Sequence, residues 1–124
     1  MTARSDPLLT LQTFGVLVER GDVDGAAALF TQDARYEEPP RPPLAGREAI
    51  RAFLADFAAR HSDARFVIGR AIVDPAGDRL AAEWRWSYTR DADGERRAYE
   101  GISIVEFRGG LIAFWRGFSA LVRS

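Results

Sequence analysis

Residues 79–108, RLAAEWRWSYTRDADGERRAYEGISIVEFR, contain two runs of alternating side chains on either side of a DADG turn. In the first run, Trp84, Trp86 and Tyr88 alternate with polar residues, and a period of two places such side chains on one face of a strand. Consecutive strands that are joined by a tight turn run antiparallel. The stretch therefore predicts an antiparallel hairpin with one aromatic face and one polar face.

Further strands flank this hairpin on both sides. The sequence predicts four strands, joined by turns rich in Gly, Asp and Pro, over residues 64–73, 79–90, 96–108 and 111–122. Strands of this length must bend, and Gly69, Gly101 and Gly117 lie where bulges or kinks would curl the sheet. We expect a strongly curved antiparallel sheet.

Helical patterns precede the strands. Helices are predicted from Pro7 to Arg20, over residues 23–31 and over residues 47–60, the last with an apolar stripe of Ile50, Phe53, Leu54, Phe57 and Ala58. A short strand, 35–38, ends at Pro39, and the proline-rich residues 39–46 are interpreted as a stiff connector rather than a peptide motif. Helices gathered before antiparallel strands indicate an α+β domain: a cone with three helices on the concave face of the sheet and a central pocket.

The composition restricts the chemistry. The chain has 124 residues, a net charge of −1, no Cys, one His and 17 basic residues, all of them Arg. Thiol catalysis and lysine Schiff bases are excluded, and one His argues against a metal site or a histidine triad. No basic stripe suggests a nucleic-acid partner, and no apolar run is long enough for a membrane span. Residues 1–11 lack a signal-peptide core, so we expect a cytoplasmic protein. We also expect no cofactor.

Four segments, in this order, carry a family resemblance: RGDVDGAAALFTQDARYEEP (20–39), AGREAIRAFLADF (45–57), AAEWRW (81–86) and GISIVEFRGGLIAFW (101–115). The sequence resembles SnoaL-like and ketosteroid isomerase-like proteins of the nuclear transport factor 2-like superfamily. The resemblance implies that residues 1–124 form one such domain. It does not imply one activity, because this fold carries isomerases, hydrolases, dehydratases, cyclases and non-catalytic binding domains.

The resemblance also assigns positions. Glu38 stands where the isomerases have their general-base Asp. Phe14 and Ser103 stand where they have the Tyr and the protonated Asp of the oxyanion hole, which is commonly the largest catalytic contribution. Ketosteroid isomerisation is therefore not expected. The Asp-Arg-Asp set of limonene epoxide hydrolases and the late carboxylate of SnoaL-type cyclases are not evident either.

Glu38, with Tyr36 beside it, is the predicted catalytic group, because burial would raise the pKa of its carboxyl toward neutrality. The residues expected to bind substrate are Phe14, Phe53, Phe57, Trp84, Trp86, Tyr88, Tyr99, Ser103, Trp115 and Ser119. His61 is expected at the surface after the third helix, without a catalytic role.

Ile102 and Ile104 point away from the aromatic face, so we expect a homodimer through the outer face of the sheet. Two functions stay open. One is a cofactor-free enzyme of the isomerase, cyclase or lyase type, transferring a proton on an apolar cyclic substrate. The other is a non-catalytic module for small-molecule binding or dimerisation. A deep cavity beside Glu38 favours the enzyme, and a cavity filled by the three Trp side chains favours the module.

Overall fold

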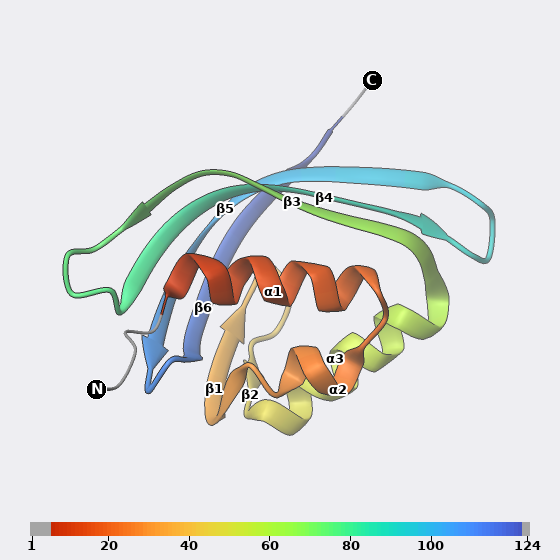
Figure 1. Cartoon of the computed structure of the whole chain (residues 1–124). Coiled ribbons are helices and arrows are strands. Elements are labelled where there is room, and N and C mark those ends of the chain that lie inside the picture. The colour runs from red at the N-terminus through yellow and green to blue at the C-terminus, as the bar shows by residue number, and fades with distance from the viewer. Residues whose placement is uncertain (1–5, 123–124) are drawn as a thin grey trace.

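The computed structural model describes residues 6–122 (Figure 1). Residues 1–5 of the N-terminal stretch that lacks a signal-peptide core lie outside the described residues. The elements, in chain order, are α1 (Pro7–Glu19), α2 (Val23–Ala27), β1 (Phe30–Glu37), β2 (Leu44–Ala45), α3 (Arg47–Arg60), β3 (His61–Val73), β4 (Arg79–Arg90), β5 (Arg96–Arg108) and β6 (Leu111–Leu121). The predicted α+β architecture is confirmed.

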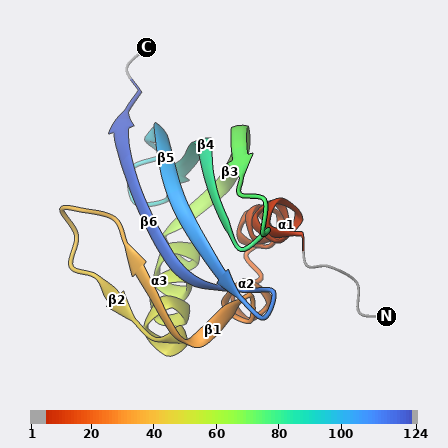
Figure 2. The same cartoon turned by 90° about the vertical axis from the view of Figure 1, so that its left-hand side faces the viewer.

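The sheet has the strand order β2-β1-β6-β5-β4-β3, and the meander from β3 to β6 is antiparallel as predicted. It curls strongly around the helices, and α1 lies under its concave face (Figures 1 and 2). The sequence did not predict that β1 pairs with β6 in parallel, which makes the sheet mixed. The short β2 pairs antiparallel with β1, so residues 38–43 form the loop of a hairpin.

Three predicted boundaries were wrong: the end of the second helix, the start of the strand predicted at residue 35, and the start of the strand predicted at residue 64. The second helix was expected to reach Thr31, but it ends at Ala27, and Phe30 and Thr31 open β1. Phe30 is fully buried and pairs with Ile112 of β6, so burial in the sheet competes successfully with the helical pattern. Strand β3, which was predicted to begin at residue 64, begins at His61, because it pairs there with the end of β4.

The three mid-strand glycines also differ from expectation. The register shifts beside Gly69, as a bulge requires, but Gly101 and Gly117 lie in regular pairs. A Cβ at Gly101 would lie 2.4 Å from Cζ2 of Trp84, and a Cβ at Gly117 would lie 2.5 Å from Oγ of Ser103. These two glycines therefore make room for neighbouring side chains rather than kinks.

Helix α1 is held at both of its ends. The Asp6 carboxylate accepts a hydrogen bond from the backbone N–H of Leu9 (3.1 Å), so it caps the helix as predicted. At the other end, the Glu19 carboxylate accepts from the backbone N–H of Phe66 on β3 (2.7 Å). Between them Phe14 packs edge-on against Phe30, with ring centroids 5.6 Å apart. These contacts fix α1 across the open side of the curled sheet.

Helix α3, at 14 residues, is the longest of the described helices. No helix within residues 6–122 is long and apolar enough to cross a membrane.

Candidate functional site

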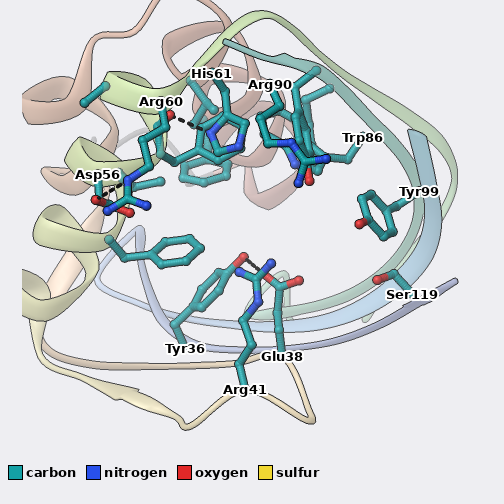
Figure 3. Close-up of a pocket in the computed structure, with 18 of the residues that line it drawn as sticks. Tyr36, Glu38, Arg41, Asp56, Arg60, His61, Trp86, Arg90, Tyr99 and Ser119 are labelled. Carbon is teal, nitrogen blue, oxygen red and sulfur yellow. Dashed lines mark hydrogen bonds and ion pairs between the residues drawn. The ribbon is translucent and has the colours of Figure 1, made fainter. Parts of the chain in front are cut away.

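A cavity of about 780 Å³ opens on the concave side of the sheet (Figure 3). Its wall is formed by side chains from α1, α3, β1, β3, β4, β5 and β6. Eleven of the twelve predicted site residues line it: Phe14, Tyr36, Glu38, Phe53, Phe57, Trp84, Trp86, Tyr88, Tyr99, Trp115 and Ser119. The three Trp side chains line this cavity without filling it.

Ser103 is the predicted site residue that does not line the cavity. Its side chain faces inward as expected but is 1% exposed, and its hydroxyl accepts a hydrogen bond from Nε1 of Trp84 (2.8 Å). The Trp84 ring lies between Ser103 and the cavity. Ser103 therefore orients a wall residue instead of offering its hydroxyl to a ligand.

Glu38 and Tyr36 lie together on one side of the cavity. Tyr36 belongs to β1, and Glu38 follows the last residue of that strand and precedes Pro39, which restricts the backbone at this point. The Tyr36 hydroxyl donates a hydrogen bond to Oε1 of Glu38 (Figure 3). The two side chains thus form a unit whose polar atoms meet at the cavity surface.

Burial raises the pKa of the Glu38 carboxyl above its usual value, because a desolvated carboxylate is unfavourable. The hydrogen bond from Tyr36 and the charge of Arg41 lower that pKa, but they do not cancel the effect of burial. Burial and the neighbouring carboxylate also raise the pKa of Tyr36 well above its usual value. Tyr36 is therefore a neutral hydrogen-bond donor, and Glu38 is the group of this pair that can exchange a proton.

The residue before Glu38 lies in a different environment. Glu37 points to the other side of the strand, where it pairs with Arg35 and lies 3.8 Å from Nη1 of Arg116. Glu38 forms no ion pair with any residue between 6 and 122. Two consecutive carboxylates thus have opposite environments, one paired with arginines and one set against aromatic rings.

Aromatic rings surround the Tyr36–Glu38 pair. The Tyr36 ring lies 5.4 Å from the Trp115 ring and 6.2 Å from the Phe53 ring, centroid to centroid. Farther along the wall, Phe57 lies 5.0 Å from Trp86. Such a surface suits a flat apolar ligand, because a few polar groups then fix its orientation.

Two tyrosines supply polar atoms on the sheet side. Burial raises the pKa of Tyr88 to about 12, and a hydrogen bond with Tyr99 acts in the same direction. Burial opposes ionisation of Tyr99 too, but Arg97 and Tyr88 outweigh it and lower the pKa of the Tyr99 hydroxyl. Tyr99 is consequently the more acidic hydroxyl of this pair and the better hydrogen-bond donor.

His61 directly follows α3 as expected, but it is half-buried instead of lying at the surface. His61 lines the cavity, stacks on Phe57 with ring centroids 4.3 Å apart, and donates from Nδ1 to the Phe57 carbonyl (2.9 Å). That bond fixes the tautomer, so Nε2 of the neutral ring is an acceptor. In Figure 3 the ring lies on the side of the cavity opposite Glu38. The polar stretch after the helix gave no signal of this, because β3 begins three residues earlier than its pattern suggests.

Arg41 and Phe66 also line the cavity and were missed. Phe66 pairs with Trp86 across β3 and β4, so alternation along β3 would have found it. Arg41 lies on the proline-rich loop, where no periodic pattern indicates direction. Among residues 6–122, no group of three or more metal-binding side chains could hold a metal ion.

A curled sheet with helices on its concave side is the ketosteroid isomerase-like fold. The family model of the SnoaL-like domain matches residues 12–115, and the chain belongs to that family. No curated protein matches the sequence.

Solved structures share the fold at low sequence identity. One is the epoxide hydrolase/cyclase-like enzyme SalBIII, which has a role in pyran ring formation in the polyether salinomycin. It is 19% identical with a TM-score of 0.81, and the match covers 92% of this chain and 90% of SalBIII. A hypothetical protein with a ketosteroid isomerase-like fold from Catenulispora acidiphila, in complex with trimethylamine, is 17% identical with a TM-score of 0.77, covering 87% and 82%. A computationally designed 17-OHP binder is 19% identical with a TM-score of 0.82, covering 96% and 99%.

Proposed function

We propose that this chain is a small cofactor-free enzyme in which Glu38 transfers a proton on an apolar, cyclic, carbonyl-type substrate. The observation that carries the proposal is the environment of Glu38: its carboxyl has a raised pKa, lacks an ion pair within the described residues and faces an open aromatic cavity. A desolvated carboxyl whose pKa lies above its usual value is a stronger base than an ordinary carboxylate, so it is suited to accept and return a proton. The reaction class that fits is isomerisation, cyclisation or elimination.

Tyr36 positions the carboxyl in this proposal. Its hydroxyl holds Oε1 of Glu38, so the other carboxylate oxygen is directed at a bound ring system. Phe14 lines the cavity with no hydroxyl, and the Ser103 hydroxyl is occupied by Trp84. The proposal therefore does not include ketosteroid isomerisation through the usual oxyanion donors.

The experiment begins with a thermal-shift screen of steroid, terpenoid and aromatic polyketide compounds. A ligand at one hundred times its dissociation constant adds roughly 2.7 kcal/mol to the free energy of unfolding. Turnover of the ligands found is then compared between the wild type and Glu38→Gln. We expect Glu38→Gln to keep ligand affinity and to lower turnover by about 10²–10⁴.

Glu37→Gln is the matched control, because it changes the adjacent carboxylate, which faces Arg35 and Arg116 instead of the cavity. We expect it to leave turnover unchanged. Equal turnover in the wild type and Glu38→Gln would contradict the role of Glu38. The second candidate function, binding without chemistry, would then be preferred; it is favoured by the open aromatic cavity itself and by the designed 17-OHP binder with the same fold.

We also propose a homodimer through the convex face of the sheet. Five apolar side chains of β3, β5 and β6 on this face are at least half exposed: Val67 (57%), Ile72 (77%), Ile102 (51%), Ile104 (54%) and Phe118 (52%). The ion pairs Arg70–Glu83 and Arg85–Glu100 lie beside them on the same face. A second copy would cover apolar surface that is otherwise in water. A cytoplasmic location stays a prediction of the sequence.

A further inference from the structure

Arg41 differs from the other charged residues of the cavity wall. Arg60 pairs with Asp56 (3.0 Å), Arg90 pairs with Asp93 (2.9 Å), and the Asp91 carboxylate accepts a hydrogen bond from the Ser62 hydroxyl (2.7 Å). These contacts pair the charges on the side of the cavity away from Glu38. Arg41 has no ion pair and no side-chain hydrogen bond with any residue the structure describes.

Arg41 is exposed to solvent, but two contacts orient its side chain toward the cavity. The backbone N–H of Arg41 donates to the Glu38 carbonyl (3.0 Å), which forms a turn and brings the two side chains to the same side of the cavity. Its Cζ atom lies 5.3 Å from the centre of the Phe53 ring, a cation–π distance. Figure 3 shows Arg41 beside Glu38, with its guanidinium directed toward the cavity.

No carboxylate among residues 6–122 lies within ion-pair distance of Arg41, and that includes Glu38. Burial favours the uncharged form of Glu38, and Glu38 already accepts a hydrogen bond from Tyr36. The charge of Arg41 also makes a small contribution that lowers the pKa of Tyr36, Tyr88 and Tyr99, although burial raises the pKa of Tyr36 and Tyr88 overall. A positive charge at an aromatic cavity without an anionic partner is complementary to an anionic ligand.

We propose that the cavity binds cyclic apolar acids, and that Arg41 holds the carboxylate of the ligand while the ring system enters among the aromatic side chains. The planar guanidinium presents N–H groups in a fork that matches the two oxygens of a carboxylate. This inference rests on the proposed function for the cavity and names its substrate class. A bound carboxylate also favours the protonated form of Glu38, which then holds a proton ready to donate.

The test compares two probes that differ in charge and little in shape, 2-naphthoate and 2-naphthamide, by isothermal titration calorimetry at pH 7. A charge-assisted pair of hydrogen bonds makes binding about 10- to 100-fold tighter. We expect the wild type to prefer 2-naphthoate by this factor and Arg41→Met to bind both probes equally. Arg41→Lys, which keeps the charge but not the fork, should retain part of the preference.

The control is the double variant Asp56→Asn/Arg60→Gln. It removes another guanidinium from the cavity wall together with its carboxylate partner, so the net charge is unchanged. This variant should keep the wild-type preference. Equal affinities in the wild type, no binding of either probe at millimolar concentration, or a preference that survives in Arg41→Met would each overturn the proposal.

The Glu38→Gln variant separates this inference from the proposed function. It removes the proton-transfer group and leaves Arg41 in place, so it should keep the preference for 2-naphthoate. If Glu38→Gln keeps the preference for 2-naphthoate and has the same turnover as the wild type, only the catalytic role of Glu38 is contradicted. If the wild type shows no preference for 2-naphthoate while turnover still depends on Glu38, only the proposed acidic substrate class is contradicted.

Discussion

Glu37 and Glu38 are adjacent, yet only Glu38 faces the aromatic cavity. This difference has a consequence for stability, because a pKa shift is a difference in free energy between the folded and the unfolded chain. The folded-state pKa of Glu38 is raised, so its ionised form is less favourable in the folded chain than in the unfolded chain. Glu38 therefore costs no stability below its unfolded pKa, and it costs progressively more as the pH rises through its folded pKa.

We predict that Glu38→Gln gains stability relative to the wild type as the pH rises from 4 to 8. Gln cannot ionise, so the variant avoids the cost, which is about 1.4 kcal/mol for each unit of pKa difference. Urea denaturation at a series of pH values measures the difference in free energy of unfolding. Glu37→Gln, which changes the adjacent carboxylate that pairs with Arg35 outside the cavity, is the control for the substitution itself. A Glu38→Gln difference that does not change with pH would contradict the burial of the carboxyl.

At the scale of single residues, the sequence predicted which side chains face inward because strand alternation is a local property. It placed Trp84, Trp86 and Tyr88 correctly at the cavity. The sequence could not predict how deeply each side chain is buried. Ser103 has the expected direction, but the Trp84 ring covers it, and ring orientation depends on contacts that no local pattern contains.

At the scale of elements, β4 and β5 approach each other closely at Gly101. A Cβ at this position would lie 2.4 Å from the Trp84 ring and 2.6 Å from the Phe118 carbonyl oxygen. We predict that Gly101→Ala lowers the free energy of unfolding by about 1–3 kcal/mol, since overpacking forces side chains or backbone to shift. Because Trp84 lines the cavity, ligand affinity should fall as well.

Gly69→Ala is the matched control for this prediction. It adds the same methyl group to a mid-strand glycine of the same sheet, but the nearest atom, the Glu83 carbonyl oxygen, would lie 3.6 Å away. Its effect on the free energy of unfolding, measured by urea denaturation, should stay within about 0.5 kcal/mol. Equal losses for the two variants would show that close approach to Trp84 is not the reason for Gly101.

The antiparallel meander could be predicted because each turn joins neighbouring strands. The parallel pairing of β1 with β6 could not, because it joins segments from opposite ends of the chain. The same pairing explains why the second helix was predicted too long. The direction of Arg41 was missed for a related reason, since its loop is closed by β2, a strand of two residues that carries no periodic signal.

At the scale of the whole molecule, the proposed homodimer depends on the convex face of the sheet. If a second copy covers it, an arginine at Ile104 would be buried opposite apolar side chains without a partner. We predict that the wild type sediments as a dimer at micromolar concentration and that Ile104→Arg weakens association by about 100-fold or more. Analytical ultracentrifugation measures both.

The control for the dimer is Leu9→Arg. Leu9 is 57% exposed on α1, which lies on the concave side of the sheet, so this change should leave the dimer intact. A wild type that sediments only as a monomer at micromolar concentration would contradict the proposed dimer. Dissociation by both variants to the same extent would place the interface elsewhere.

Trp84, Trp86 and Trp115 are all the tryptophans of the chain, and all three line the cavity. Every indole ring of the protein therefore lies in the wall that a ligand would touch. A bound ring system would contact the cavity-facing side of these indoles and change the intensity and wavelength of their fluorescence. Emission from the unlabelled protein thus reports occupancy of the cavity directly, with no background from tryptophans elsewhere in the molecule.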